Sequence, residues 1–197
     1  MANPNLKRIF PNPITLSKTL KFKKITISGK KRRLSKAVTI EDLRKIAKRR
    51  TPRGPFDYTD GAAESESSLS RARALYSNLE FRPNVLRDVS KLDTSVEILG
   101  EKFALPFGIA PTGFTRMMNA EGEVAGARAA DKFAIPFTLS TLGTSTISEV
   151  VSAAPLGRNW FQLYMWKDRE ASIALVDQAW SAGVRNLILT VDVPVAG

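Results

Sequence analysis

The second half of the chain alternates short apolar runs with longer segments in which apolar residues recur at helical spacing. Four runs of six or seven residues follow one another in this way: residues 105–110, 135–140, 159–165 and 187–193. We interpret these runs as continuously apolar and not alternating, which predicts strands that are buried on both faces. Strands of this kind belong to parallel sheets, so the pattern predicts consecutive β/α units.

Helices are predicted between the runs, over residues 121–132, 145–153 and 168–182, and Gly183 suits the position just after the last of them. Four units make half of an eight-stranded barrel, which typically needs about 250 residues. We therefore predict an α/β fold, the first half (about four β/α units) of a TIM (β/α)8 barrel. Topology alone also allows a small, open, doubly wound sheet. The turn at 110–113, Ala-Pro-Thr-Gly, argues against it because that fold calls for a Gly-rich phosphate loop after the first strand.

N-terminal helices and a hairpin are predicted before the barrel units. Thr39 can cap a helix over 40–47, which has acids in its first turn and bases in its last, and Pro52 closes it. A second helix is predicted over about 64–77. Residues 95–104 contain two short extended pieces around a Gly-centred turn, which predicts a hairpin.

Charge separates the N-terminus from the rest. Residues 1–53 carry 17 Lys and Arg against 2 acids, or +15, although the whole chain carries only +11. We predict three regions: a basic arm over 1–38, helices and a hairpin covering the barrel over 39–104, and the barrel units over 105–197. The arm fits an anionic membrane surface, a solvated leader or, less well, nucleic acid, because no base-reading motif accompanies its charge.

The composition removes several kinds of chemistry. The chain has no cysteine, which excludes disulfides and thiolate sites, and no histidine, the commonest general base near neutral pH. It has no apolar run of about 18 residues and no secretory leader pattern, so neither a membrane span nor a cleaved signal is predicted. The expected location is cytoplasmic, with peripheral attachment to the inner face of the cell membrane as an option.

Four segments in register carry a resemblance to a known family, from about residue 38 to the end of the chain. They are residues 56–64 (FDYTDGAAE), 106–113 (PFGIAPTG), 160–164 (WFQLY) and 189–194 (LTVDVP). The chain resembles the FMN-dependent 2-hydroxy-acid dehydrogenases and oxidases. It is most similar to L-lactate dehydrogenases that pass electrons to quinone or cytochrome. One departure is Ala62, where relatives such as glycolate oxidase have Gly.

The resemblance implies oxidation of an L-2-hydroxy acid, L-lactate to pyruvate, by hydride transfer to flavin N5. It makes Tyr58 a ligand of the substrate carboxylate. Tyr164 becomes both a substrate ligand and a catalytic residue near the reacting hydroxyl. The residues it places against FMN are Ala110, Pro111, Thr112, Gly113, Ser140, Gln162 and Thr190. Each of the polar residues alone is better explained by a strand-end cap or an amphipathic core position. Together they stand at successive strand ends, where barrel enzymes place their chemistry.

The resemblance also implies what the chain lacks. The family's catalytic His, its carboxylate-binding Arg, the Lys beside flavin N1 and the phosphate-binding loops all follow the position where this chain ends. We therefore predict that the chain is a truncation, inactive alone and weak in FMN binding, from a full-length protein that forms a homo-oligomer. The alternatives are a non-catalytic half-barrel that pairs with a partner chain and a basic nucleic-acid-binding or membrane-binding protein.

Overall fold

The computed structural model describes residues 28–192. Internal contacts divide the chain into two units, Met1–Arg50 and Thr51–Gly197, which are treated separately below. The predicted boundaries at 38/39 and 104/105 remain predictions. Over the described residues, no helix has the length and apolar character needed to cross a membrane.

The first unit contains two helices, α2 (Gly29–Leu34) and α3 (Ile40–Lys48). α3 confirms the prediction for this segment, and a capping box starts it: the Thr39 hydroxyl accepts from the Asp42 amide at 3.2 Å, and the Asp42 carboxylate accepts from the Thr39 amide at 3.1 Å. α2 is a short helix within the predicted basic arm, and Ser28 caps it. The rest of the arm lies outside the described residues.

The second unit begins with α4 (Arg53–Asp60) and α5 (Ser67–Ser77). Pro52 stands at the start of α4, a helix that the sequence did not predict, and its fixed φ suits the start of a helix. α5 begins at Ser67, three residues later than predicted. The delay follows from the backbone, because Glu64 and Glu66 adopt φ of 49° and 57°, in the left-handed region.

The predicted hairpin is confirmed as β1 (Val96–Ile98) paired antiparallel with β2 (Glu101–Phe103). Leu99 and Gly100 join the strands, and both have positive φ, 53° and 78°. Two positive φ values are those of the type I′ turn, whose twist matches that of two antiparallel strands. The Phe103 ring meets Trp160 edge to face at 5.9 Å, so the hairpin packs against the main sheet.

The main sheet is parallel, with β3 (Phe137–Ser140), β4 (Asn159–Tyr164) and β5 (Asn186–Thr190) in chain order. The first predicted strand is only partly formed: Ile109 bridges to Phe137 in parallel, and the rest of 105–110 is irregular. We attribute this to Pro106 and Pro111, which cannot donate backbone hydrogen bonds. Each segment lies beside its predecessor, with none of the order reversal that marks a doubly wound sheet.

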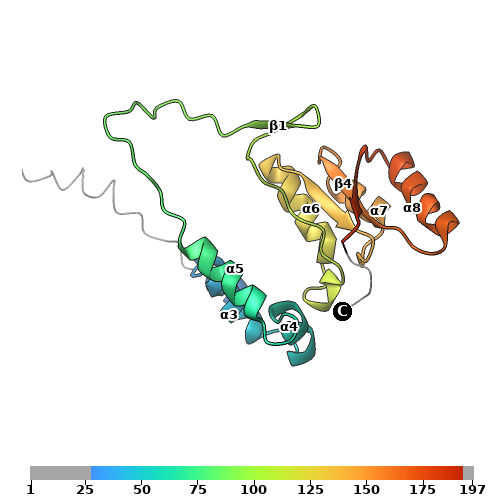
Figure 1. The fold of residues 1–197 in the computed structure, drawn as a ribbon, viewed down its shortest axis with the longest axis horizontal. Coiled ribbons are helices and arrows are strands. Elements are labelled where there is room, and N and C mark those ends of the chain that lie inside the picture. Colours follow the sequence, from blue (N-terminus) through green and yellow to red (C-terminus); the bar gives the residue numbers. More distant parts are fainter. Residues whose placement is uncertain (1–27, 193–197) are drawn as a thin grey trace, which may run out of the picture. The chain divides into compact units, whose positions relative to one another are not determined.

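A helix crosses between each pair of neighbouring strands, as predicted: α6 (Gly122–Phe133), α7 (Ile147–Ala153) and α8 (Arg169–Ser181), with a short 3₁₀ turn, η1 (Thr115–Met117), before α6 (Figure 1). The predicted stop signal at Gly183 is confirmed. Its φ is 95°, its amide donates to the Trp180 carbonyl, and the Val184 amide donates to Ala179, which together make a Schellman motif.

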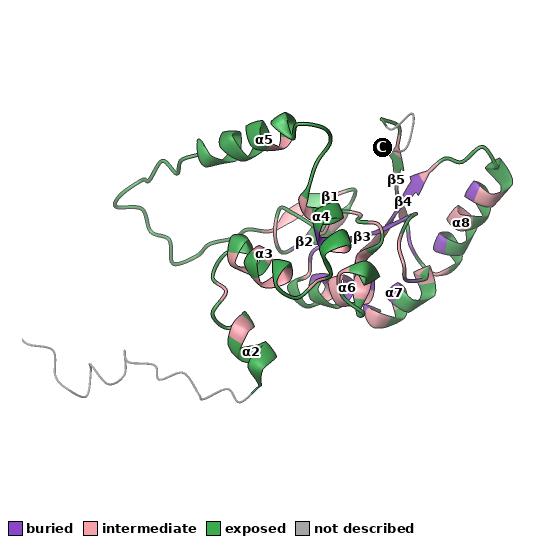
Figure 2. Ribbon diagram, turned by 90° about the horizontal axis from the view of Figure 1, so that it is seen from below, coloured by how far each residue is buried: buried purple, intermediate pink, exposed green. Residues whose placement is uncertain are grey.

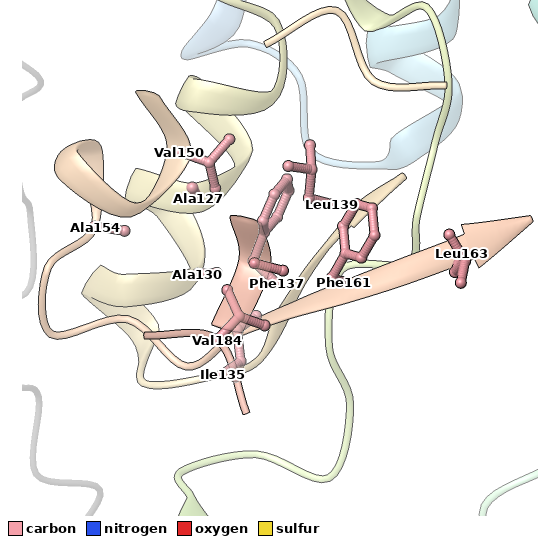
Figure 3. Close-up of a cluster of buried hydrophobic side chains, with 11 residues drawn as sticks. Ala127, Ala130, Ile135, Phe137, Leu139, Val150, Ala154, Phe161, Leu163 and Val184 are labelled. Atoms are coloured by element: carbon pink, nitrogen blue, oxygen red, sulfur yellow. The ribbon is translucent and has the colours of Figure 1, made fainter. Parts of the chain in front are cut away.

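All three helices contribute to one apolar core. Ala127 and Ala130 of α6, Val150 of α7 and Ala179 of α8 join strand side chains in a single cluster. Figure 3 shows strand residues of this cluster, including Phe137, Leu139, Phe161 and Leu163, and in it Phe137 lies beside the helix that carries Ala127. These strand residues alternate with polar ones, so the helices cover one face of the sheet and the opposite face holds the polar side chains.

We predicted that every strand is buried on both faces, and this prediction is wrong for β5. β3 is buried at every position, whereas β5 alternates between half-buried and exposed residues (Figure 2). Leu187 of β5 remains 49% exposed. The reason is position, because β5 is the edge strand of the described sheet and has a strand neighbour on one side only.

Candidate functional site

Three polar side chains form a hydrogen-bonded row across the carboxyl ends of the strands. Ser140, Gln162 and Thr190 come from β3, β4 and β5 in that order. The Gln162 carbonyl accepts from the Ser140 hydroxyl at 3.1 Å, and its amide nitrogen donates to the Thr190 hydroxyl at 2.9 Å. The row links the strand ends through side chains and fixes the orientation of the Gln162 amide.

Gln162 is the centre of this row, and its side chain is only 2% exposed. Its carbonyl oxygen accepts a second hydrogen bond from the Thr141 amide at 3.2 Å. A glutamine amide carries two N–H donors. Within residues 28–192 only one of them has an acceptor, the Thr190 hydroxyl. The other is available to a ligand.

Thr141 ties the end of β3 to β4. Its hydroxyl donates to the Gln162 carbonyl of the main chain at 2.6 Å and accepts from the Tyr164 amide at 3.0 Å. It therefore continues the pairing of the two strands beyond Ser140 and holds the backbone at Tyr164. The sequence offered no signal for this role, because a Thr after a strand is common in any turn.

One cavity of about 470 Å³ brings together almost all of the residues predicted for the site. Those in its lining are Tyr58, Pro111, Thr112, Gly113, Ser140, Gln162, Tyr164 and Thr190. Ala110 is the exception and is not part of the lining. Thr59, Phe114 and Leu142 also line the cavity and were not predicted. The whole cavity lies within the second unit, and the role of each residue in it stays a prediction.

The turn that follows Ala110 lies against the loop after β3. The Phe114 amide donates to the Leu142 carbonyl at 3.0 Å. A Cβ at Gly113 would lie 3.0 Å from the Leu142 Cβ, so any larger residue would push these two loops apart. Gly113 thus permits the close approach of two segments that both border the cavity.

The two tyrosines reach the cavity from different elements. Tyr58 lies on α4 and is 68% exposed, while Tyr164 ends β4 and is half-buried. Neither phenol has a hydrogen-bond partner in the part of the chain that the structure describes. A phenol O–H can donate one hydrogen bond. Both hydroxyls are therefore free to donate to a bound anion.

A buried carboxylate behind the cavity was missed by the sequence reasoning. Glu123 on α6 is 3% exposed and accepts from the Thr144 amide at 2.7 Å and the Ser145 hydroxyl at 2.8 Å. Burial raises the pKa of Glu123, but hydrogen bonds, led by that from the Thr144 amide, outweigh it and lower the pKa from 4.5 to about 2. One signal was present: Glu123 shares a helix face with Ala127 and Ala130, so a charge lies on an apolar stripe.

Arg116 supports the same loop from the other side. Its guanidinium donates to the Thr144 carbonyl at 3.0 Å and to the Glu149 carboxylate at 3.3 Å. The hydrogen bond from the Thr146 amide lowers the pKa of Glu149 most, and the hydrogen bond from Arg116 lowers it further. Glu123 and Arg116 together hold Thr144 and Ser145, which continue the loop that borders the cavity through Ser140 and Leu142.

The geometry suits a flat, polar-edged ligand. A row of one amide and two hydroxyls offers both donors and acceptors along a line, as the edge of a planar heterocycle with alternating N–H and C=O groups requires. The glycine-containing turn borders the same cavity and leaves backbone close to its surface. The residues present therefore fit the isoalloxazine ring of FMN.

Comparisons with known proteins agree with this assignment. The family described as FMN-dependent dehydrogenase matches residues 47–197. A putative L-lactate dehydrogenase of Mycobacterium tuberculosis is 54% identical over 192 residues, which cover 98% of this chain and 46% of the relative. An L-lactate dehydrogenase of Ectopseudomonas mendocina is 45% identical over 156 residues, 79% of this chain and 41% of the relative.

Solved structures give the same result. A crystal structure of mandelate oxidase superposes with a TM-score of 0.75 and 36% identity, over 80% of this chain and 46% of that one. The chain thus spans about half the length of the curated relatives that it matches. FMN is the cofactor of the matching family. On these grounds the chain belongs to the FMN-dependent dehydrogenase family.

Proposed function

We propose that this chain forms the first half of a (β/α)8 barrel in an FMN-dependent enzyme that oxidises an L-2-hydroxy acid, with L-lactate to pyruvate as the reaction. The observation that carries the proposal is the single cavity lined by eight predicted site residues at the strand ends. Barrel enzymes place their active sites at that end of the strands. The names of the matched relatives favour L-lactate as the substrate.

FMN would be held by the turn at 111–113 and by the polar row of Ser140, Gln162 and Thr190. When bound, it supplies the acceptor for the two electrons and the hydrogen that leave C2 of the substrate. Gln162 would orient FMN by donating its free N–H to an acceptor on the ring edge. Burial of Gln162 strengthens that hydrogen bond, because water does not compete for the donor.

Tyr58 and Tyr164 would bind the substrate. The Tyr58 phenol donates to the substrate carboxylate, and Tyr164 donates near the reacting hydroxyl. The hydrogen bond from the Tyr164 amide to Thr141 keeps this residue in register with β3, so its phenol starts from a fixed backbone. Hydrogen bonds to a charged acceptor are about twice as strong as neutral ones, so a carboxylate is well suited to this pair.

The hydroxyl proton needs a base, and the chain contains no histidine. General-base help is typically worth about 10²–10⁴-fold in rate. We propose that the 197-residue chain binds FMN weakly and does not turn over by itself, and that the base and the phosphate site belong to further sequence of a longer, homo-oligomeric protein. A quinone or a cytochrome is the proposed electron acceptor.

Fluorescence titration of FMN against the purified chain tests the cofactor site. Gln162→Leu should weaken FMN binding about fivefold, because a lost hydrogen bond costs on the order of 1 kcal/mol. Gln178→Leu is the matched control, since Gln178 lies exposed on α8 and does not line the cavity. If the two variants bind FMN equally well, the assigned flavin site is wrong.

Addition of L-lactate to the FMN-loaded chain under anaerobic conditions tests the other half of the proposal. We expect no bleaching of the flavin absorbance and loss of the flavin during gel filtration. Bleaching by L-lactate would show that the chain supplies its own base. It would refute the proposal that the base belongs to further sequence of a longer protein. Such bleaching would not contradict the proposed flavin site.

A further inference from the structure

A second cavity lies in the first unit and is rich in cationic side chains. Its volume is about 490 Å³, and it is bordered by the end of α2, the connection that follows and one side of α3. Arg33, Lys36, Lys45, Arg49 and Arg50 surround it, with Asp42 as the one acid in its lining. Nothing in the proposed enzymatic function uses this cavity.

The positive charge of this cavity is not neutralised within the described residues. The Asp42 carboxylate accepts from the Val38 and Thr39 amides, each at 3.1 Å, and is thereby committed to the start of α3. Glu41, the other acid of this unit, contacts Arg44 at 3.1 Å and does not line the cavity. Five cations against one carboxylate leave a net charge of +4, which an anionic ligand would relieve.

Apolar side chains accompany these cations. Ala37 and Ile46 belong to the cavity lining, and Val38 and Ile40 beside it are 89% and 82% exposed. Aliphatic side chains between cations are typical of a surface that enters the headgroup region of a lipid bilayer. A single-stranded nucleic acid would favour aromatic side chains for base stacking, and residues 28–50 contain none.

We propose that this cationic cavity binds the phosphate groups of anionic phospholipids and attaches the first unit to a bilayer surface. The inference goes beyond the proposed enzymatic function and does not depend on it. The adjacent sequence is consistent with it, because residues 1–27 add six Lys and Arg and no acid. Attraction to the surface would come from many cations, and the cavity would give the contact a defined place.

Co-sedimentation of the full 197-residue chain with vesicles tests this proposal, using phosphatidylglycerol mixed with phosphatidylcholine against phosphatidylcholine alone. The variant Lys45→Gln/Arg49→Gln should bind the anionic vesicles about 30-fold more weakly, at about 1 kcal/mol per cation near the surface. Glutamine is a good helix former, so α3 should persist, which far-UV circular dichroism checks. The control Arg87→Gln/Lys91→Gln removes the same charge from exposed positions in the second unit and should bind nearly as well as the wild type.

A third variant, Val38→Ser/Ile40→Ser, should weaken vesicle binding at high NaCl as well, because the apolar contribution is not screened by salt. Equal losses in the two glutamine variants would overturn the proposal, since they would show diffuse attraction without a defined site. Binding of inorganic phosphate together with equal binding to the two kinds of vesicle would overturn it in favour of a small-anion site. Tighter binding to a DNA fragment than to vesicles at the same salt would overturn it in favour of nucleic acid.

Discussion

Replacing Glu123 by glutamine should destabilise the second unit in a manner that depends on pH. The substitution preserves the size of the side chain and removes its charge. In the structure, three donors hold the carboxylate: the Thr144 amide at 2.7 Å, the Thr144 hydroxyl, whose single proton is shared between the two carboxylate oxygens at 3.0 and 2.9 Å, and the Ser145 hydroxyl at 2.8 Å. A glutamine amide has one oxygen to accept these bonds and turns its N–H groups toward other donors.

The magnitude follows from the pKa of Glu123, which folding lowers from 4.5 to about 2. Each pKa unit corresponds to about 1.4 kcal/mol, so the ionised carboxylate contributes about 3 kcal/mol to stability at pH 7. Because the folded pKa is depressed, this contribution is complete above about pH 4.5 and is lost as the pH falls through about 2. At pH 3, about 1 kcal/mol of it remains.

Urea unfolding followed by circular dichroism at pH 7 and at pH 3 measures this effect. The free energy of unfolding of Glu123→Gln should fall below that of the wild type by about 3 kcal/mol at pH 7 and by about 1 kcal/mol at pH 3. Glu170→Gln is the control, because Glu170 is exposed in the first turn of α8 and its replacement should cost less than about 0.5 kcal/mol. A deficit for Glu123→Gln that is small at pH 7, or that does not shrink in acid, would refute the assignment of Glu123 as an ionised anchor of the loop.

Four further substitutions test the packing and the helix ends by the same unfolding assay. Leu163→Ala should cost about 2–5 kcal/mol because Leu163 is buried in the core, whereas Leu187→Ala at the half-exposed edge should cost less than about 1 kcal/mol; equal costs would contradict the described core. Gly183→Ala should cost about 1 kcal/mol, because its φ of 95° is strained for any residue with a Cβ. Thr146→Ala should cost about 1 kcal/mol by removing the cap that accepts from the Glu149 amide at 3.2 Å, and an unchanged midpoint would show that the cap is dispensable.

Local features of this protein could be predicted from the sequence because the interactions that create them span only a few residues. Thr39 and its capping partner Asp42 are three positions apart, and the hairpin turn at Leu99 and Gly100 is equally short. α8 ends just before Gly183 because the Gly183 and Val184 amides donate to carbonyls three and five residues earlier in the chain. The three strands and the helices between them also lie where the apolar pattern predicted them, since burial on a sheet selects for such runs.

Features that depend on contacts distant in sequence were decided by the tertiary structure. The Glu123 carboxylate finds its partners at Thr144 and Ser145, 21 and 22 residues away, so its burial could not be derived from α6 alone. The exposure of β5 follows from its place at the sheet edge and not from its composition. Family resemblance predicted which residues belong to the site. Only the parallel register of the strands brings Ser140, Gln162 and Thr190 within hydrogen-bond distance, because pairing sets which side chains share a face.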